Sequence, residues 1–373
     1  MPARTSPSPS PRKKSAQAAK SAKKFRVAFI GAGGIANTHM NFLEKMSDIE
    51  LVGLSDVNEK GMAEKAQKHN IDAANCFTDW KTMLAKVQPD GVSVCTPNGL
   101  HAQATIDALS AGAHVLVEKP MAMNAREAQA MIDAAKKNAK KLVIAFQYRY
   151  APKTEYLRKA VADGAFGKIL YARVHALRRR GIPNWGVFGR KELQGGGPMI
   201  DIGVHAMEMA HFTMGSPKPV AAVGSTFTYL GDRKSDVKSM WPNWDHKTYN
   251  VEDLAVGQIR FDNGAVMSVE ASFVAHIPTD VFNFWLMGEK AGAQWSPPMI
   301  YTDRHGHMVD EQPSYLGVDD FNSYFGAKMR NWVEHCHYDK PTMAPAEHGL
   351  MVQKMLDGIY ESAEKGGREV KIA

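Results

Sequence analysis

Three side chains in two separate segments could act together on a substrate hydroxyl group. Lys119 ends a short apolar segment, residues 114–118, and the proline after it disfavours a helical backbone, so the lysine is expected at a strand tip. Asp201 and His205 are four residues apart after a glycine triplet, residues 195–197, and this spacing puts both on one face of a helix. A carboxylate beside an imidazole orients the ring and favours its protonated form, which suits proton transfer near neutral pH.

A glycine-rich turn points to a dinucleotide cofactor. The apolar segment 25–30 leads directly into residues 31–36 and then into a helix. Gly31, Gly33 and Ala36 fit the G-x-G-x-x-G/A pattern, which gives a tight turn, close approach of the backbone to pyrophosphate, and a small residue for helix packing. The residues of this turn that are predicted to contact the cofactor are Gly31, Gly33, Gly34 and Ile35.

Asp56 has the position of an acid that binds the adenosine ribose. It follows a second apolar segment, residues 50–55, and lies 20 residues beyond Ala36, where a carboxylate can accept hydrogen bonds from the ribose hydroxyls. The next basic residue is Lys60, so no Lys or Arg directly after Asp56 is placed to bind a 2'-phosphate. NAD is therefore predicted in preference to NADP. In the alternative interpretation, Asp56 only caps a helix that starts near Asn58.

More polar residues are expected at the carboxyl ends of neighbouring parallel strands, where open α/β sheets bind their ligands. Strand candidates at residues 91–95 and 114–118 both end in polar residues or lead into them. Glu118 could tether the next residue, Lys119, or balance its charge. The glycine triplet is expected to leave room for a flat ligand such as nicotinamide. The strand-end residues predicted to contact the cofactor are Thr96, Asn98, His101, Glu118 and Lys119.

The order of strand and helix patterns predicts an α/β protein of two domains. Strands alternate with helices at first, so residues 25–147 are predicted to form a Rossmann domain, a doubly wound parallel sheet that binds NAD. Longer strand patterns and a hairpin turn at residues 262–264 follow, so residues 148–373 are predicted to form an α/β domain with an open, mainly antiparallel sheet that binds substrate. Its last helix, about residues 346–365, is expected to pack back on the Rossmann domain. The open sheet face favours a homo-oligomer.

Composition and charge argue against several other classes of protein. Of the 46 Lys and Arg residues in this 373-residue chain, seven lie in residues 1–24, which contain no acid, so 39 remain to balance the 39 Asp and Glu residues. The positive net charge therefore belongs to a tail that is predicted to be disordered, and no nucleic acid partner is expected. No apolar run is long enough to span a membrane. Three cysteines without metal-like spacing indicate free thiols, no metal site, and a cytoplasmic location.

Four motifs in one order give the chain a resemblance to a known enzyme family. They are the glycine turn, Thr96–Asn98, Glu118–Pro120 and Gly195–His205. In these motifs, and over roughly residues 25–370, the chain resembles the Gfo/Idh/MocA oxidoreductases, named for glucose-fructose oxidoreductase and inositol dehydrogenase. The resemblance implies NAD(P) binding and hydride transfer to or from a ring hydroxyl carbon of a sugar, polyol or sugar derivative. The catalytic positions of the family fall on Lys119, Asp201 and His205.

The implied reaction removes the proton of a secondary alcohol while a hydride leaves its carbon. His205, oriented by Asp201, is the candidate base, and Lys119 is expected to bind the same oxygen and to stabilise its developing charge. The roles of the lysine and the histidine could be exchanged. One arginine of the run 178–180 could reach a substrate hydroxyl or carboxylate.

Substrate contacts follow from residue type and from the resemblance. The segment containing Arg149 matches a family segment that lies near nicotinamide and substrate. Tryptophan faces stack on sugar rings, so Trp185, and Trp241 and Trp244 of a long polar loop at about residues 231–250, could bind a sugar or pack on a protein surface. A neutral sugar or cyclitol is the predicted substrate, and its predicted contacts are Lys119, Arg149, Trp185, Asp201 and His205.

Two other functions remain open. An enzyme of this type could use bound NAD to oxidise a sugar, eliminate and re-reduce, which breaks a glycosidic bond without net redox change. A sensor could bind NAD and a sugar without catalysis. The catalytic residue types at Lys119, Asp201 and His205 argue against a pure sensor.

Overall fold

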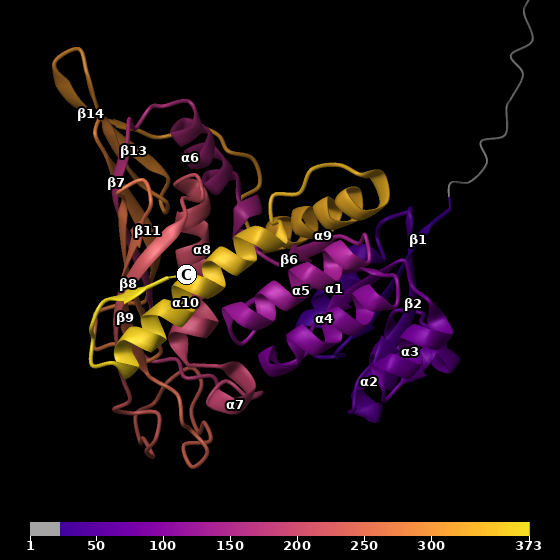
Figure 1. Cartoon of the computed structure of the whole chain (residues 1–373). Coiled ribbons are helices and arrows are strands. Elements are labelled where there is room, and N and C mark those ends of the chain that lie inside the picture. The colour runs from indigo at the N-terminus through magenta and orange to yellow at the C-terminus, as the bar shows by residue number, and fades with distance from the viewer. Residues whose placement is uncertain (1–22, 373) are drawn as a thin grey trace, which may run out of the picture.

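The computed structural model describes residues 23–372 and arranges them in two α/β domains that lie side by side (Figure 1). Residues 1–22, which hold most of the predicted basic tail, and residue 373 lie outside the described residues. One domain is built on a six-stranded sheet and the other on a nine-stranded sheet. Within residues 23–372, no helix is both long enough and apolar enough to cross a membrane.

The first domain has the doubly wound parallel sheet that the sequence predicts. Its strands pair only in parallel, in the order β3-β2-β1-β4-β5-β6. The strands are β1 (Phe25–Ile30), β2 (Ile49–Ser55), β3 (Cys76–Phe77), β4 (Gly91–Val94), β5 (His114–Val117) and β6 (Leu142–Ile144). The helices are α1 (Gly34–Leu43), α2 (Glu59–Lys68), α3 (Trp80–Val87), α4 (His101–Ser110) and α5 (Ala125–Lys137). Because helices cover both faces of this sheet, β4 and the end of β5 are fully buried.

The second domain is a mixed sheet in the order β14-β13-β12-β11-β7-β10-β9-β8-β15. Only its β7–β10 pair is parallel, and β9 and β10 form the predicted hairpin. The strands are β7 (Ile169–Leu177), β8 (Pro219–Phe227), β9 (Leu254–Phe261), β10 (Val266–Ser272), β11 (Val281–Gly288), β12 (Ala291–Gln294), β13 (Met299–Arg304), β14 (His307–Glu311) and β15 (Val370–Lys371). The helices are α6 (Pro152–Ala162), α7 (Lys191–Gln194), α8 (Val204–Thr213), α9 (Phe321–Tyr338) and α10 (Ala346–Glu364).

The sequence predicts β7 to β11 and every strand of the first sheet except β3. It misses β12 to β15, which are short or carry charged ends such as Asp303 and Arg304, so they show no sustained alternation of apolar and polar residues. The three cysteines are free thiols, as predicted, although Cys76 and Cys336 are partly exposed. The cytoplasmic location stays a prediction.

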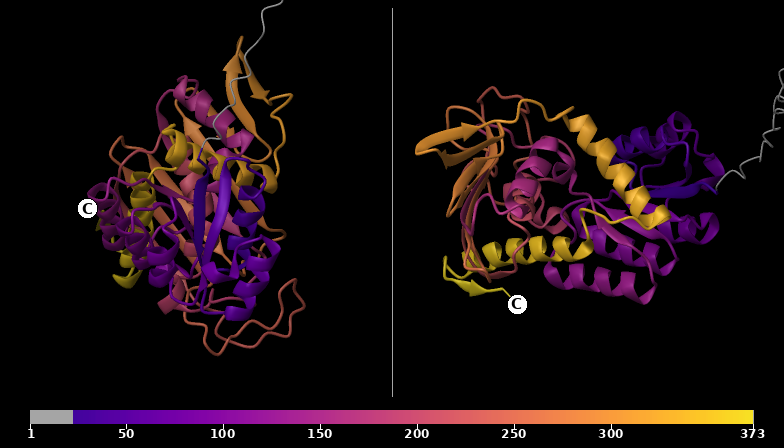
Figure 2. Two further views of the ribbon diagram at one scale, coloured as in Figure 1. Left: turned by 90° about the vertical axis from the view of Figure 1, so that its right-hand side faces the viewer. Right: turned by 90° about the horizontal axis from the view of Figure 1, so that it is seen from above.

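Helices cover only one face of the second sheet. Seen from above, α6 and α8 lie between this sheet and the first domain, and α10 runs along the same side (Figure 2). Inward side chains such as Val174, Phe284 and Val269 are fully buried, whereas the outward Arg173 and Met287 remain exposed. This alternation is typical of a sheet with one open face.

The helix α10 joins the two domains. Near its start Gly349 packs on Ile144 of β6, and near its middle Asp357 Oδ2 accepts a hydrogen bond of 2.6 Å from the N–H of Ala125 in α5. Further along, a Cβ on Gly224 of β8 would lie 2.4 Å from the carbonyl oxygen of Ile359, so only glycine permits this approach of helix and sheet.

A buried cluster of charged groups joins α9 to the tip of β5. Lys328 Nζ lies 3.2 Å from Glu118 Oε1 and 2.9 Å from His39 Nε2, and none of the three residues is more than 7% exposed. The other Glu118 oxygen, Oε2, accepts a hydrogen bond of 3.2 Å from the backbone N–H of Lys119. The cluster therefore fixes the backbone at the position that the sequence predicts to be catalytic.

The charge state of this cluster follows from burial. Burial opposes the charged form of Glu118, but the pKa of Glu118 still lies well below its ordinary value, mainly because of the neighbouring Lys328 charge. Burial, with the Lys328 charge, lowers the pKa of His39 to about 4. A neutral His39 can accept from Lys328 through Nε2 while Nδ1 donates to Ser93 Oγ at 2.9 Å. Lys328 and Glu118 are then the ion pair of the cluster.

We expect Lys328→Met to lower the free energy of unfolding by about 3–5 kcal/mol at pH 7, because it leaves a buried carboxylate without its partner. The depressed pKa of Glu118 contributes stability above the ordinary glutamate pKa and loses it as pH falls, so the deficit should shrink below about pH 5. Chemical denaturation of the full chain across this pH range measures both effects.

The double variant Lys328→Met/Glu118→Gln removes the unpaired charge and should recover most of the lost stability. Lys340→Met is the matched control, since Lys340 pairs with Glu334 at the surface and such pairs contribute less than about 1 kcal/mol. A double variant as unstable as Lys328→Met would contradict the ion-pair explanation.

Candidate active site

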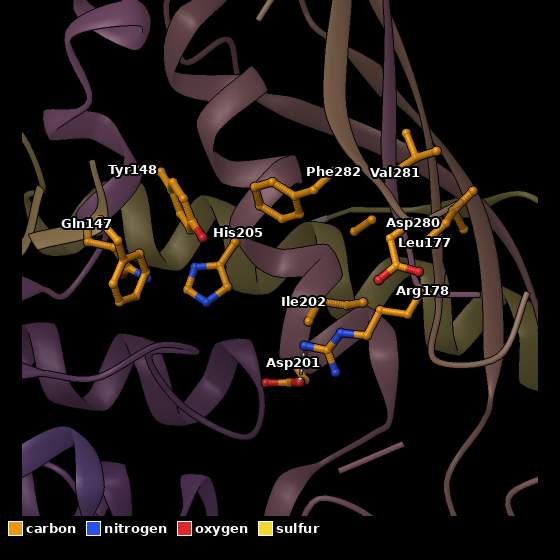
Figure 3. A pocket seen from close by; sticks show the side chains of 12 residues that line it. Gln147, Tyr148, Leu177, Arg178, Asp201, Ile202, His205, Asp280, Val281 and Phe282 are labelled. Atoms are coloured by element: carbon orange, nitrogen blue, oxygen red, sulfur yellow. Dashed lines mark ion pairs between the residues drawn. The ribbon is translucent and has the colours of Figure 1, made fainter. Parts of the chain in front are cut away.

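A cavity of about 290 Å³ opens where the end of β7, the start of α8 and the start of β11 meet the segment after β6 (Figure 3). Two of the three predicted catalytic residues, Asp201 and His205, line it, and Lys119 adjoins it through Asp201. The polar lining residues are Gln147, Tyr148, Arg178, Asp201, His205 and Asp280.

Lys119 and Asp201 meet across the two domains. Lys119 Nζ donates a hydrogen bond of 3.0 Å to the backbone oxygen of Asp201 and lies 3.4 Å from its Oδ1. Their side chains are 16% and 12% exposed, so the pair is partly desolvated. Arg178 Nη2 lies 4.0 Å from the other carboxylate oxygen, Oδ2 (Figure 3). The carboxylate thus holds two cations at the cavity wall.

His205 is not paired with Asp201, so the predicted arrangement of these two residues is wrong. Met199–Gly203 forms a π-helical turn before α8, and its wider spacing removes the i, i+4 alignment. His205 instead meets the ring of Tyr148 edge to face, with centroids 5.3 Å apart, and its Nδ1 is buried without a hydrogen-bond partner.

The predicted protonation of His205 is wrong as well, because the sequence favoured the protonated ring and the structure favours the neutral one. Burial, followed by the Lys119 charge, holds the pKa of His205 well below its ordinary value. Imidazole is therefore the neutral form at pH 7, which is the form that can accept a proton.

A second buried acid fixes the start of this helix. Glu252 accepts hydrogen bonds from the N–H groups of Gly197 at 2.8 Å and Met199 at 3.3 Å, and from the Tyr360 hydroxyl of α10 at 2.7 Å. A Cβ on Gly197 would lie 2.1 Å from the Glu252 backbone oxygen, and one on Gly196 would lie 2.2 Å from Tyr360 Oη. These two glycines are explained by packing within the protein, so the structure gives no support to the expected room for nicotinamide.

The glycine turn has the geometry of a phosphate cradle. Gly31 has a φ of +96°, and a Cβ there would lie 2.6 Å from the backbone oxygen of Cys95, so the turn sits tightly on the end of β4. A Cβ on Gly33 or Gly34 would meet no atom within 4 Å. The helix α1 starts directly after this turn, and its first N–H groups, at Gly34 and Ile35, have no side-chain cap. Such a helix start fits the pyrophosphate of a dinucleotide.

Asp56 lies beside the same turn. Its Oδ2 accepts a hydrogen bond of 2.6 Å from the N–H of Ala32, and its Oδ1 accepts one of 2.8 Å from the N–H of Asn58. The N-cap of α2 is Asn58, whose side chain accepts from Gly61, so the interpretation of Asp56 as a mere cap is wrong. The carboxylate is partly exposed and stays the predicted ribose acceptor.

The strand-end residues divide into different roles. Thr96 Oγ1 is buried with no partner, an orphaned group that a ligand could satisfy. Asn98 Nδ2 donates to the backbone oxygen of Gln194 at 2.9 Å. The ring nitrogens of His101 lie 2.8 and 2.9 Å from the carbonyl oxygens of Pro120 and Thr96, so this buried residue links two loops. Glu118 holds the backbone of Lys119 rather than its ammonium group.

Arg149 cannot contact a substrate, so that prediction is wrong. Its side chain is fully buried, where Nε donates to Glu208 Oε2 at 2.7 Å and Nη1 lies 2.7 Å from the Met343 oxygen and 2.8 Å from His348 Nδ1. Trp185 lies outside the main cavity and lines a second one.

Sequence reasoning missed several residues that shape the site. Asp280 and the apolar Phe282 and Phe321 line the cavity. Lys328 and Glu252 do not line it, but their hydrogen bonds fix the segments that carry its polar residues. A strand-end aspartate at residue 280 is a signal that could have been found. The partners of the two buried residues lie far away along the chain, so no local pattern reveals them.

Comparisons with known proteins agree with this fold. The Gfo/Idh/MocA family models match residues 25–146, as the NAD-binding Rossmann fold of an oxidoreductase family, and residues 158–372, as its C-terminal α/β domain. A D-glucoside 3-dehydrogenase of Escherichia coli (strain K12) is 38% identical over 345 residues, which cover 92% of this chain and 96% of that protein. A levoglucosan dehydrogenase of Pseudarthrobacter phenanthrenivorans is 32% identical over 63% of this chain and 62% of its own length.

A solved structure has the same fold. Levoglucosan dehydrogenase in complex with NADH and levoglucosan matches 94% of this chain and 100% of its own, with a TM-score of 0.81 at 24% identity. Both family models match in order and together span most of residues 25–372. The chain therefore belongs to the Gfo/Idh/MocA oxidoreductase family, and residues 25–146 are its NAD-binding domain.

Proposed function

We propose that this protein is an NAD-dependent dehydrogenase that acts on a ring CH–OH carbon of a neutral sugar, a glycoside or a cyclitol. The observation that carries the proposal is that Asp201 and the neutral His205 line one cavity while Lys119 is hydrogen-bonded to Asp201. Relatives named D-glucoside 3-dehydrogenase, levoglucosan dehydrogenase and myo-inositol 2-dehydrogenase support the class of substrate.

The residues of the cradle fit NAD. The glycine turn would receive the pyrophosphate, Asp56 the adenosine ribose, and Thr96 a polar group of the bound cofactor. Bound NAD supplies the hydride acceptor of the reaction. Because Asp56 already accepts two backbone hydrogen bonds as a carboxylate, a 2'-phosphate beside it would be repelled, which supports NAD over NADP.

His205 and Lys119 have complementary tasks in the proposed reaction. The neutral His205 imidazole can take the hydroxyl proton as the hydride leaves the carbon. The Lys119 ammonium group stabilises the developing negative charge on the same oxygen. Asp201 positions Lys119 and Arg178 at the cavity wall.

We expect Lys119→Ala and His205→Ala each to reduce turnover by at least about 10²-fold, since each removes a group that acts on the reacting oxygen. NADH absorbance over a panel of sugars, glycosides and cyclitols, with NAD and NADP, measures turnover. NAD binding, followed separately by calorimetry, should survive in both variants.

Lys137→Ala, on the exposed face of α5, is the control and should retain wild-type turnover. Near-normal turnover in both site variants would refute these roles. Release of the phenol from a chromogenic glycoside without accumulation of NADH would instead favour the redox-cycling, glycoside-cleaving alternative.

The pKa of His205 gives a second test. We expect Lys119→Met to raise the pKa of His205 towards its ordinary value, because it removes the charge that, after burial, lowers that pKa most. The imidazole of the variant should therefore become protonated at a higher pH than in the wild type. NMR titration of the ring protons measures this, with the His205→Gln spectrum to identify the signal among the 14 histidines.

Lys137→Met serves as the control for this titration, and its His205 signal should follow the wild type. A wild-type pKa at or above 6.5, or no rise in Lys119→Met, would contradict the proposed electrostatics.

We also propose that the open sheet face pairs two copies of the chain. Apolar side chains on that face remain partly or largely exposed, and they include Val223, Val256, Trp285, Met287 and Tyr301. Burying such a face between two copies removes it from water. Sedimentation should show an assembly that Met287→Glu dissociates and Lys137→Glu leaves intact. A monomeric wild type at micromolar concentration would refute the pairing.

A further inference from the structure

Two tryptophans form an aromatic path that leads out of the main cavity. Arg178 lines that cavity, and its guanidinium carbon lies 4.9 Å from the ring centroid of Trp241. Trp241 meets Trp185 edge to face, with centroids 4.7 Å apart and an angle of 87° between the rings. Trp185 keeps 50% of its surface exposed. An exposed aromatic face therefore lies one ring beyond the cavity wall.

The loops that carry these tryptophans are fixed in place. Asn184 Nδ2 donates a hydrogen bond of 2.8 Å to the Pro242 backbone oxygen, which ties the two loops together. Trp244 is largely buried, and its Nε1 donates to the Gly231 oxygen at 2.8 Å, so it anchors the loop while it also lines the second cavity beside Trp185. The aromatic surface is thus formed before any ligand arrives, which reduces the entropy cost of binding.

A second cavity of about 180 Å³ opens beside Trp185. Phe188 adds a second aromatic wall, and Asn184, Arg190 and Thr248 add hydrogen-bonding groups. This cavity shares no lining residue with the main one, so it is a separate place for a ligand group. Aromatic walls with a few polar groups are typical of sites that hold a ring bearing hydroxyls.

The aromatic path is coupled to the predicted catalytic residues through Arg178. Its guanidinium group lies between Trp241 on one side and the Asp201 carboxylate, 4.0 Å from Nη2, on the other. Asp201 in turn holds Lys119. A group bound against the tryptophans would therefore adjoin the place where the reacting ring is held.

We propose that Trp185, Trp241 and the second cavity form a subsite for the group attached to the sugar ring that is oxidised. The proposal rests on the function proposed above and specifies its substrate as a glycoside whose aglycone contains a ring, either a second sugar or an aryl group. The main cavity holds the reacting ring, and the tryptophans stack against the aglycone ring.

The test compares kcat/KM for glycosides that differ only in the aglycone. The substrates are methyl glucoside, p-nitrophenyl glucoside and a glucose disaccharide, each as α and β anomers, followed by NADH absorbance. Trp185→Ala is expected to lower the ratio of kcat/KM for the ring-bearing aglycones to that for methyl glucoside about tenfold, which corresponds to about 1.4 kcal/mol of lost stacking. Trp185→Phe keeps an aromatic face and should keep most of that ratio.

Met240→Ala is the matched control, because Met240 precedes Trp241 on the same loop and is 82% exposed. Its ratio should equal that of the wild type. A loss with both the aryl glucoside and the disaccharide, or with one of them, supports the subsite and identifies the preferred ring. A Trp185→Ala ratio within twofold of the wild type for both aglycones would overturn the subsite alone. A wild type that reduces NAD with none of these compounds or the wider panel would overturn the subsite and the proposed function together.

Discussion

The contact between the Lys119 ammonium group and Asp201 is the constraint on which the rest of the structure depends. It joins the tip of β5 in the first domain to the π-helical turn of the second, across 82 positions of the chain. A buried glutamate accepts hydrogen bonds from the backbone of the segment that carries each partner. One is paired with Lys328 of α9, and the other accepts the hydroxyl hydrogen bond of Tyr360 in α10. The two helices near the end of the chain therefore each fix one half of the site.

Features of the fold encoded within a few residues could be predicted from the sequence. The glycine turn at Gly31 and Gly33 and the hairpin turn at residues 262–264 each depend on the chemistry of neighbouring residues. The position of Lys119 at a strand tip is of the same kind. The spacing of apolar residues then predicted a parallel sheet followed along the chain by a mainly antiparallel one. Parallel strands that are covered on both faces are continuous apolar segments, which distinguishes them from half-exposed strands.

Contacts set by distant parts of the chain could not be predicted in this way. The spacing of Asp201 and His205 implied one helical face, but backbone N–H groups at the start of this segment donate hydrogen bonds to Glu252, about 50 residues later, and the segment forms a π-helical turn. Arg149 lies in a segment that matches a family segment near the substrate, yet its partners lie 59 to 199 residues away and bury it completely. Lys328 reaches its acid across 210 positions. Residue type alone does not show which face of an element becomes buried.

The charges around the main cavity restrict what can enter it. Lys119 and Arg178 bring two positive charges, Asp201 and Asp280 bring two negative charges, and His205 is neutral at pH 7. The positive and negative charges of these side chains therefore cancel before a substrate binds. A neutral sugar would exchange hydrogen bonds with these groups and leave the balance intact, whereas a phosphate ester would add charge that none of the lining residues compensates. Since the fold is shared by relatives with different substrates, this balance carries more information about the substrate than the fold does.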